Sequence, residues 1–234
     1  HEGALLIENE HAISINLEPG FWNFSATTPS SPTPLVIAGN YNGLRTFSWQ
    51  NNRFNKGDSI PGFTESSRFV ATDQQGNIWV SHPYHGIFRI SNYLTSSQSV
   101  KKYGIKNGLP SDFNNYIYKI RNQIVAATEK GVFSYHPETD QFLPDPFFQN
   151  IIGNISVRVL KEDTEGNIWF IHEKFPAVID LGSEKPKVIY LQELNNKLVS
   201  GFECIYPVNH NNVFLGSEKG FFHVNYEKYK KNAV

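Results

Sequence analysis

The sequence predicts an all-β fold, a β-propeller of four-stranded antiparallel blades, with about five blades in a closed ring or in an arc of a larger propeller. Three observations predict it. A short apolar motif recurs at intervals of 40 to 45 residues along the 234-residue chain, which is the period of a four-stranded blade. Turn-forming Asp and Gly residues separate strand-like runs. Aromatic residues make up 14% of the chain, and helical apolar periodicity is rare.

The recurring motif is a small residue followed by an alternating apolar stretch, and we assign it to the third strand of each blade. Five copies begin with glycine, and one degenerate copy begins with proline: Gly3, Gly43, Gly86, Gly131, Pro176 and Gly220. A second strand precedes most copies, at residues 35–39, 77–81, 124–128, 167–171 and 213–217. Its continuous apolar run predicts burial on both faces, between neighbouring blades.

The first, innermost strand of a blade is predicted at residues 67–72 and 156–161, and a hairpin turn joins it to the second strand. Asp73 and Gly76 lie in one such turn, and Asp163 and Gly166 in another. The aspartate would accept backbone N–H groups of the turn, and the glycine would supply positive φ. These roles explain both residues without a calcium ion. The blade at 106–150 has only a short turn near Arg121.

Polar outer strands are expected at residues 52–54, 100–103, 141–143 and 188–191, as suits an edge. The repeats then run near 1–18, 19–60, 61–105, 106–150, 151–195 and 196–226, so that the propeller covers 1–226. Residues 1–18 would supply a third and a fourth strand, and the last repeat a first, second and third. A Pro-rich insertion is expected around 29–34, and 227–234 is expected to be a polar tail or linker.

Charge and composition exclude several classes of protein. The formal net charge is -1 with acidic and basic residues interspersed, so direct nucleic-acid contact by this piece is not expected. No apolar run reaches the length of a membrane span. The single cysteine, Cys204, lies between apolar neighbours and is expected to be a buried strand thiol. The chain starts at His1 and contains no methionine, so we expect a fragment or processed form.

Two segments resemble the two-component regulator propeller repeat of Bacteroidetes sensors. They are Asp73-x-x-Gly76-Asn77-Ile78-Trp79, which is followed by the motif at Gly86, and residues 163–169 with the same spacing. The glycine-containing segments at 39–47, 62–69, 104–110 and 127–133 strengthen the likeness, which spans 35–226. Two features depart from the family pattern: the short turn in the blade at 106–150, and Pro176 in place of glycine.

The resemblance implies that this chain is the periplasmic, ligand-sensing region of a membrane-anchored regulator. That regulator would be of the hybrid two-component type or the triple-tyrosine-motif type, and it would regulate transcription. Glycans or their breakdown products are the ligands that the resemblance suggests. A homodimer in the parent receptor, a membrane span in missing parts, and a histidine kinase or helix-turn-helix output are further implications. No cofactor is expected.

A candidate binding face follows from propeller geometry. Loops from the second to the third strand and from the fourth to the next first strand emerge together, which makes that face the default binding surface. Two pairs of residues match across a 90-residue offset, Arg68 with Arg158 and His82 with His172. Together with loop residues they would offer aromatic platforms and polar donors for a sugar or carboxylate: Tyr41, Tyr84, His85, Lys130, Lys174 and Phe175.

The structural alternative is simpler for any single one of these residues. His82 and His172 would pack against neighbouring blades, the arginines would bond backbone carbonyls, and the aromatic rings would pack at the rim. A metal site from His82, His85 and His172 is disfavoured, because the matched histidines are two blades apart and lack ligand spacing. We therefore predict no metal site and no catalytic residue.

Two other function classes stay open. A propeller glycosidase or lyase would need paired carboxylates on one face, and the turn spacing Asp-x-x-Gly differs by one residue from the sialidase Asp-box. A protein–protein interaction scaffold would need no small-molecule pocket, and an apolar, aromatic rim without a concave polar pocket would favour it. We expect the chain not to be an enzyme.

Overall fold

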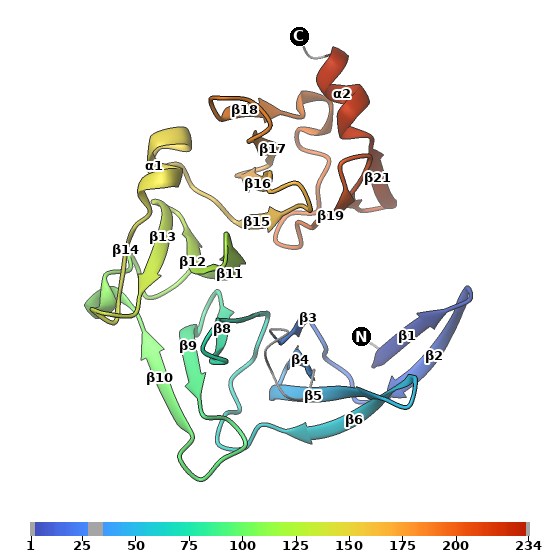
Figure 1. Ribbon diagram of the computed structural model, residues 1–234, viewed down its shortest axis with the longest axis vertical. Coiled ribbons are helices and arrows are strands. Elements are labelled where there is room, and N and C mark those ends of the chain that lie inside the picture. Colours follow the sequence, from blue (N-terminus) through green and yellow to red (C-terminus); the bar gives the residue numbers. More distant parts are fainter. Residues whose placement is uncertain (1–2, 28–34, 233–234) are drawn as a thin grey trace. The chain divides into compact units, whose positions relative to one another are not determined.

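The computed structural model describes residues 3–27 and 35–232 as antiparallel sheets joined by turns and short helices (Figure 1). The expected insertion around 29–34 lies outside the described residues. The chain divides into two compact units, the first ending at Ile124 and the second beginning at Val125. The division falls inside β12 (Gln123–Thr128). Each unit is described by itself below.

The first unit begins with a two-stranded hairpin and continues with two four-stranded sheets, in which neighbouring strands follow the chain order. The hairpin pairs β1 (Ala4–Glu8) with β2 (His11–Asn16). The two sheets contain β3 (Asn23–Ala26), β4 (Leu35–Asn40), β5 (Gly43–Gln50) and β6 (Arg53–Ser59), then β7 (Phe69–Thr72), β8 (Ile78–His82), β9 (Gly86–Ser91) and β10 (Ser99–Tyr103).

A third four-stranded sheet contains β11 (Tyr116–Ile120), β12, β13 (Gly131–His136) and β14 (Gln141–Pro144). The short turn expected in this blade joins β11 to β12, where Arg121 and Asn122 have φ of 50° and 59°. Positive φ at both central residues is the geometry of a two-residue hairpin turn whose twist matches its strands. The prediction of a short turn is confirmed.

The second unit continues with β15 (Val159–Glu162), β16 (Ile168–His172), β17 (Phe175–Asp180) and β18 (Lys187–Tyr190) in a four-stranded sheet. A three-stranded sheet follows, with β19 (Ile205–Asn209), β20 (Asn212–Ser217) and β21 (Gly220–Val224). The sheets are blades of a β-propeller, as predicted: four are complete, and β19–β21 form a fifth that has three strands in the described part of the chain.

The Asp/Gly turns are structural, as expected, and they also anchor a tryptophan that the sequence analysis did not connect with them. Asp73 Oδ1 accepts the backbone N–H groups of Gln75 and Asn77, and its Oδ2 accepts the Trp79 indole N–H at 2.8 Å. Gly76 has φ of 81°. The Asp163 turn repeats these bonds, with the Trp169 indole at 3.0 Å from Oδ2.

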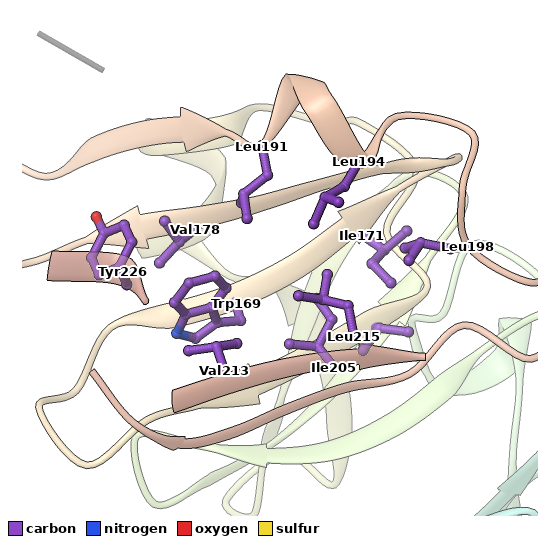
Figure 2. Packing of buried hydrophobic residues seen from close by; sticks show 11 residues of the cluster. Trp169, Ile171, Val178, Leu191, Leu194, Leu198, Ile205, Val213, Leu215 and Tyr226 are labelled. Atoms are coloured by element: carbon purple, nitrogen blue, oxygen red, sulfur yellow. The ribbon is translucent and has the colours of Figure 1, made fainter. Parts of the chain in front are cut away.

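The core lies between neighbouring blades. In the first unit, Ile78 and Val80 of β8 share one cluster with Ile37 and Leu44 of the preceding sheet. In the second unit, Trp169 lies at the centre of a cluster from β15 to β21 (Figure 2). The second strands β8 and β16 are buried along nearly their whole length, because a blade on each side covers alternate residues.

Among the described elements, three short helices connect blades: η1 (Ile105–Asn107), α1 (Pro146–Ile152) and η2 (Gln192–Leu194). A fourth, α2 (Tyr226–Asn232), follows the last strand. Asp145 caps α1 by accepting the N–H groups of Phe147 and Phe148, and Pro146 starts the helix, a recognisable start signal. In the residues that the structure describes, no helix has the length and apolarity needed to cross a bilayer.

Two expectations need correction. Residues 227–232 of the segment expected as a polar tail form most of α2, because Tyr226 is fully buried in the core and holds the start of the helix against the blade. Cys204, expected to be buried, is exposed. It lies just before β19, so it does not share the inward position of Ile205.

Candidate functional site

The loops after second strands lie beside the loops that precede first strands, as the propeller geometry predicted. In the first unit, Ser67 donates its backbone N–H to Asn40, and Gly43 donates to Glu65. In the second unit, Val157 donates to Thr128 at 2.9 Å. These bonds join loops of adjacent blades and fix the side chains that the loops carry.

His82, at the end of β8, lies among aromatic rings of the β8–β9 loop. Its ring is 5.6 Å from the ring of Tyr84 and 4.7 Å from that of His85. The backbone N–H of Tyr84 donates to His82 Nδ1 at 3.3 Å. Because Nδ1 accepts a hydrogen bond, the proton of the neutral imidazole is on Nε2, which is left as a donor.

The charges around His82 favour its neutral form. Burial lowers the pKa of His82 below that of an ordinary histidine, and the positive charges of His85 and Arg68 act in the same direction, while Glu65 opposes them. His85 Nδ1 lies 2.9 Å from Glu65 Oε2. Glu65 therefore lies beside the more exposed of the two imidazoles.

Arg68 lies over two aromatic rings. Its guanidinium carbon is 5.2 Å from the ring centre of Trp22 and 5.4 Å from that of Phe69, within the range of a cation–π contact. Trp22 also meets Tyr41, with 5.4 Å between ring centres, edge to face. We call the following residues the loop cluster: Trp22, Tyr41, Glu65, Arg68, His82, Tyr84 and His85.

The remaining predicted residues belong to the second unit. Arg158 Nη1 lies 3.3 Å from Glu203 Oε1, and His172 Nδ1 lies 2.8 Å from the carbonyl oxygen of Ser156. Since a carbonyl only accepts, His172 is protonated on Nδ1, the opposite tautomer from His82. Lys130 and Lys174 are exposed on the β12–β13 and β16–β17 turns.

The structure thus groups the predicted residues by unit. Five of them, Tyr41, Arg68, His82, Tyr84 and His85, lie in the loop cluster. Sequence reasoning missed two members, Trp22 and Glu65. Glu65 could have been predicted, because it lies in the same β6–β7 loop as Arg68.

A separate apolar pocket of about 270 Å³ lies between the β1–β2 hairpin and the sheet β3–β6. The sequence analysis did not predict it. Apolar side chains from all six strands line it: Ala4, Leu5, Leu6, Ile15, Phe24, Val36, Phe47 and Phe54. A pocket of this kind suits an apolar group better than a sugar.

The depressed pKa of His82 predicts a pH-dependent contribution to stability. The native state binds fewer protons at this site than the unfolded chain, so the protein should lose stability as the pH falls from about 8 to about 5. His82→Gln should lose less over this range, whereas His11→Gln, at an exposed position, should follow the wild type. Urea unfolding at several pH values measures this, and parallel curves for His82→Gln and wild type would contradict it.

Comparison with known proteins gives structural matches alone. No protein-family model matches the chain, and no curated protein sequence matches it. Two solved structures, described as extracellular domains of hybrid two-component systems of B. thetaiotaomicron, superpose with TM-scores of 0.62 and 0.59 at 16% and 15% identity. They cover 94% and 97% of this chain. The chain resembles these propeller domains in fold.

The chain spans 31% of the length of each of these domains. A streptogramin B lyase also superposes, with a TM-score of 0.51 at 12% identity, covering 88% of this chain and 68% of the lyase. At such identities a shared fold is what the matches show, and fold alone does not determine function.

Proposed function

We propose that this chain is the extracytoplasmic, ligand-sensing propeller domain of a two-component-type regulator, and that the loop cluster recognises a glycan or a related small molecule. The observation that carries the proposal is the grouping of a cation, two imidazoles and exposed aromatic rings on adjoining loops of two blades. The likeness to extracellular domains of hybrid two-component systems supports the sensing role.

The chemistry of the loop cluster suits an acidic sugar. Arg68 offers a guanidinium that pairs with a carboxylate, and its stacking on Trp22 holds it in place. His82 offers an Nε2 donor, and Tyr84, which is 77% exposed, offers an aromatic face. Aromatic bodies with a few fixed polar groups are the usual composition of a small-molecule site.

The wider assignment follows the same resemblance. In the parent receptor the domain would lie in the periplasm, and the membrane anchor, the dimer contact and the transcription-regulating output would belong to other parts of that protein. The ligand would act by favouring one conformation of the propeller over another.

A second candidate function is binding of a protein partner, and the apolar pocket beside β1 favours it. Exposed Leu5 and Phe24 at its mouth would be covered by an apolar side chain of the partner. An enzymatic role has one point in its favour, the contact between His85 and Glu65, which pairs a base with a carboxylate.

A thermal-shift panel of neutral and uronic-acid oligosaccharides tests the proposal. A ligand at a hundred times its Kd stabilises the fold by about 2.7 kcal/mol, which corresponds to a rise in Tm of roughly 5–10 °C. We expect acidic sugars to give such a shift and neutral sugars to give less. Tyr84→Ala and Arg68→Gln should abolish it.

The matched control is Tyr206→Ala, which removes an exposed tyrosine of β19 in the second unit and should keep the full shift. No shift with any sugar, or an equal loss in Tyr206→Ala and Tyr84→Ala, would overturn the assignment. Release of new reducing ends during the assay would select the enzymatic alternative.

A further inference from the structure

A histidine in the β19–β20 turn faces two carboxylates of the β15–β16 turn. His210 Nδ1 lies 3.3 Å from Glu165 Oε2 and 3.9 Å from Asp163 Oδ2. One ligand atom from each of the three residues lies within 4.8 Å of the others. The three residues come from two blades of the second unit, and none of them was singled out as a ligand by the sequence analysis.

The other nitrogen of His210 has its own partner. Nε2 lies 3.2 Å from Glu227 Oε1 of α2, and the ring packs against Tyr226 at 5.0 Å. Nδ1 is also within hydrogen-bond distance of Glu165 Oε2, so a metal ion would have to displace any proton between them. In the tautomer protonated on Nε2, beside Glu227, the lone pair on Nδ1 points toward Glu165 and Asp163. A carboxylate on the far nitrogen is the arrangement that orients a metal-binding histidine.

In that tautomer, His210 Nδ1 and the carboxylates of Glu165 and Asp163 are three acceptors within 4.8 Å of one another. Together they would stabilise a cation. For a tetrahedral zinc ion with bonds of 2.0–2.2 Å, two ligand atoms are about 3.3–3.6 Å apart, and the 3.3 Å between Nδ1 and Glu165 Oε2 lies at the lower end of this range. Asp163 Oδ2 already accepts bonds from Trp169 and Asn167, so its contribution is negative charge behind the site. The nearby Asn167 Nδ2, 3.4 Å from Nδ1, is the group that would have to give way.

The equivalent turn of the first unit shows that these ligands are not needed for the fold. Asp73 makes the same bonds to its turn and to Trp79 as Asp163 makes to its own. Gln75 stands at the position of Glu165, and Arg121, in the β11–β12 turn, at the position of His210. The first unit therefore lacks both of the residues that would bind the metal, although its turn keeps the same fold.

We propose that Glu165 and His210 bind a divalent transition-metal cation of the zinc class, with Asp163 adding charge behind it and Glu227 orienting the imidazole. One imidazole and one carboxylate favour zinc over calcium, which prefers six or more oxygens. Water completes the coordination. Bound metal would link the two blades to each other and, through Glu227, to α2. This inference does not depend on the sugar-binding proposal.

Isothermal titration of the chelator-treated protein with zinc chloride, and separately with calcium chloride, tests the site. We expect one equivalent of zinc to bind more tightly than calcium. His210→Gln and Glu165→Gln should each weaken zinc binding at least tenfold, and Glu227→Gln should weaken it by about tenfold, the effect of losing an orienting partner.

The control is His11→Gln, which removes an exposed histidine of β2 and should leave zinc binding unchanged. Circular dichroism verifies that each variant is folded. The graft Gln75→Glu with Arg121→His should raise the zinc stoichiometry to two. Absence of saturable zinc binding, or binding that survives both His210→Gln and Glu165→Gln, would overturn the proposal.

Discussion

Replacing Tyr226 with alanine is expected to lower the free energy of unfolding of the second unit by about 3–5 kcal/mol, the usual cost of truncating a buried aromatic side chain. Tyr226 is fully buried, and its ring meets that of Trp169 at 5.2 Å (Figure 2). Its hydroxyl donates to Asp180 Oδ2 at 2.5 Å. The substitution removes both contacts and should release the start of α2.

Two companion variants separate the contributions. Tyr226→Phe keeps the ring and removes only the hydroxyl, so we expect a loss of about 1–3 kcal/mol, limited because Lys230 Nζ still lies 2.8 Å from Asp180 Oδ2. Lys228→Ala, at an exposed position of the same helix, should change stability by less than about 0.5 kcal/mol. Urea unfolding followed by circular dichroism measures all three, and a Tyr226→Ala protein as stable as Lys228→Ala would contradict the packing of α2.

The second large effect is expected at the turn aspartates. Asp163→Ala should cost about 3 kcal/mol or more, because it leaves the buried Trp169 indole and backbone N–H groups of the turn without their acceptor. Asp163 Oδ1 accepts the N–H of Asn167 at 2.9 Å. Asp73→Ala should cost a similar amount, because its bonds to Asn77 and Trp79 have nearly the same lengths.

Tryptophan fluorescence during urea unfolding reports these losses directly. Gln74→Ala, at an exposed position of the same turn as Asp73, is the matched control and should remain within about 0.5 kcal/mol of wild type. If Asp73→Ala behaves like Gln74→Ala, the aspartate does not stabilise the turn, and its presence in two blades would need another explanation.

The blades were predictable from the sequence because a blade is a local structure. Its four strands follow one another along the chain, so a motif recurring at Gly43, Gly86 and Gly131 marks the same strand each time. The turn roles of Asp73 and Gly76 were predictable for the same reason. The hydrogen bond from the Trp79 indole to Asp73 was not predicted, because it crosses the hairpin from β8 back to the turn. The repeat spacing does not give the register of the two strands, which decides that contact.

The partners of the site residues were harder to predict because they come from distant segments. Arg68 lies over Trp22, a residue of an earlier loop, and nothing in the local sequence of either marks the contact. The same holds for α2. Its polar sequence favours a solvated tail, whereas one buried residue, Tyr226, holds it against Trp169 and Asp180.

Histidine side-chain NMR tests the central claim, that the loop cluster is the ligand-binding site, most directly. On titration with the uronic-acid oligosaccharide that stabilises the protein most, we predict that the imidazole signals of His82 and His85 shift in a saturable manner while those of His11 and His136 stay in place. Saturation with His82 and His85 unmoved, or with the shifts confined to other histidines, would contradict the account.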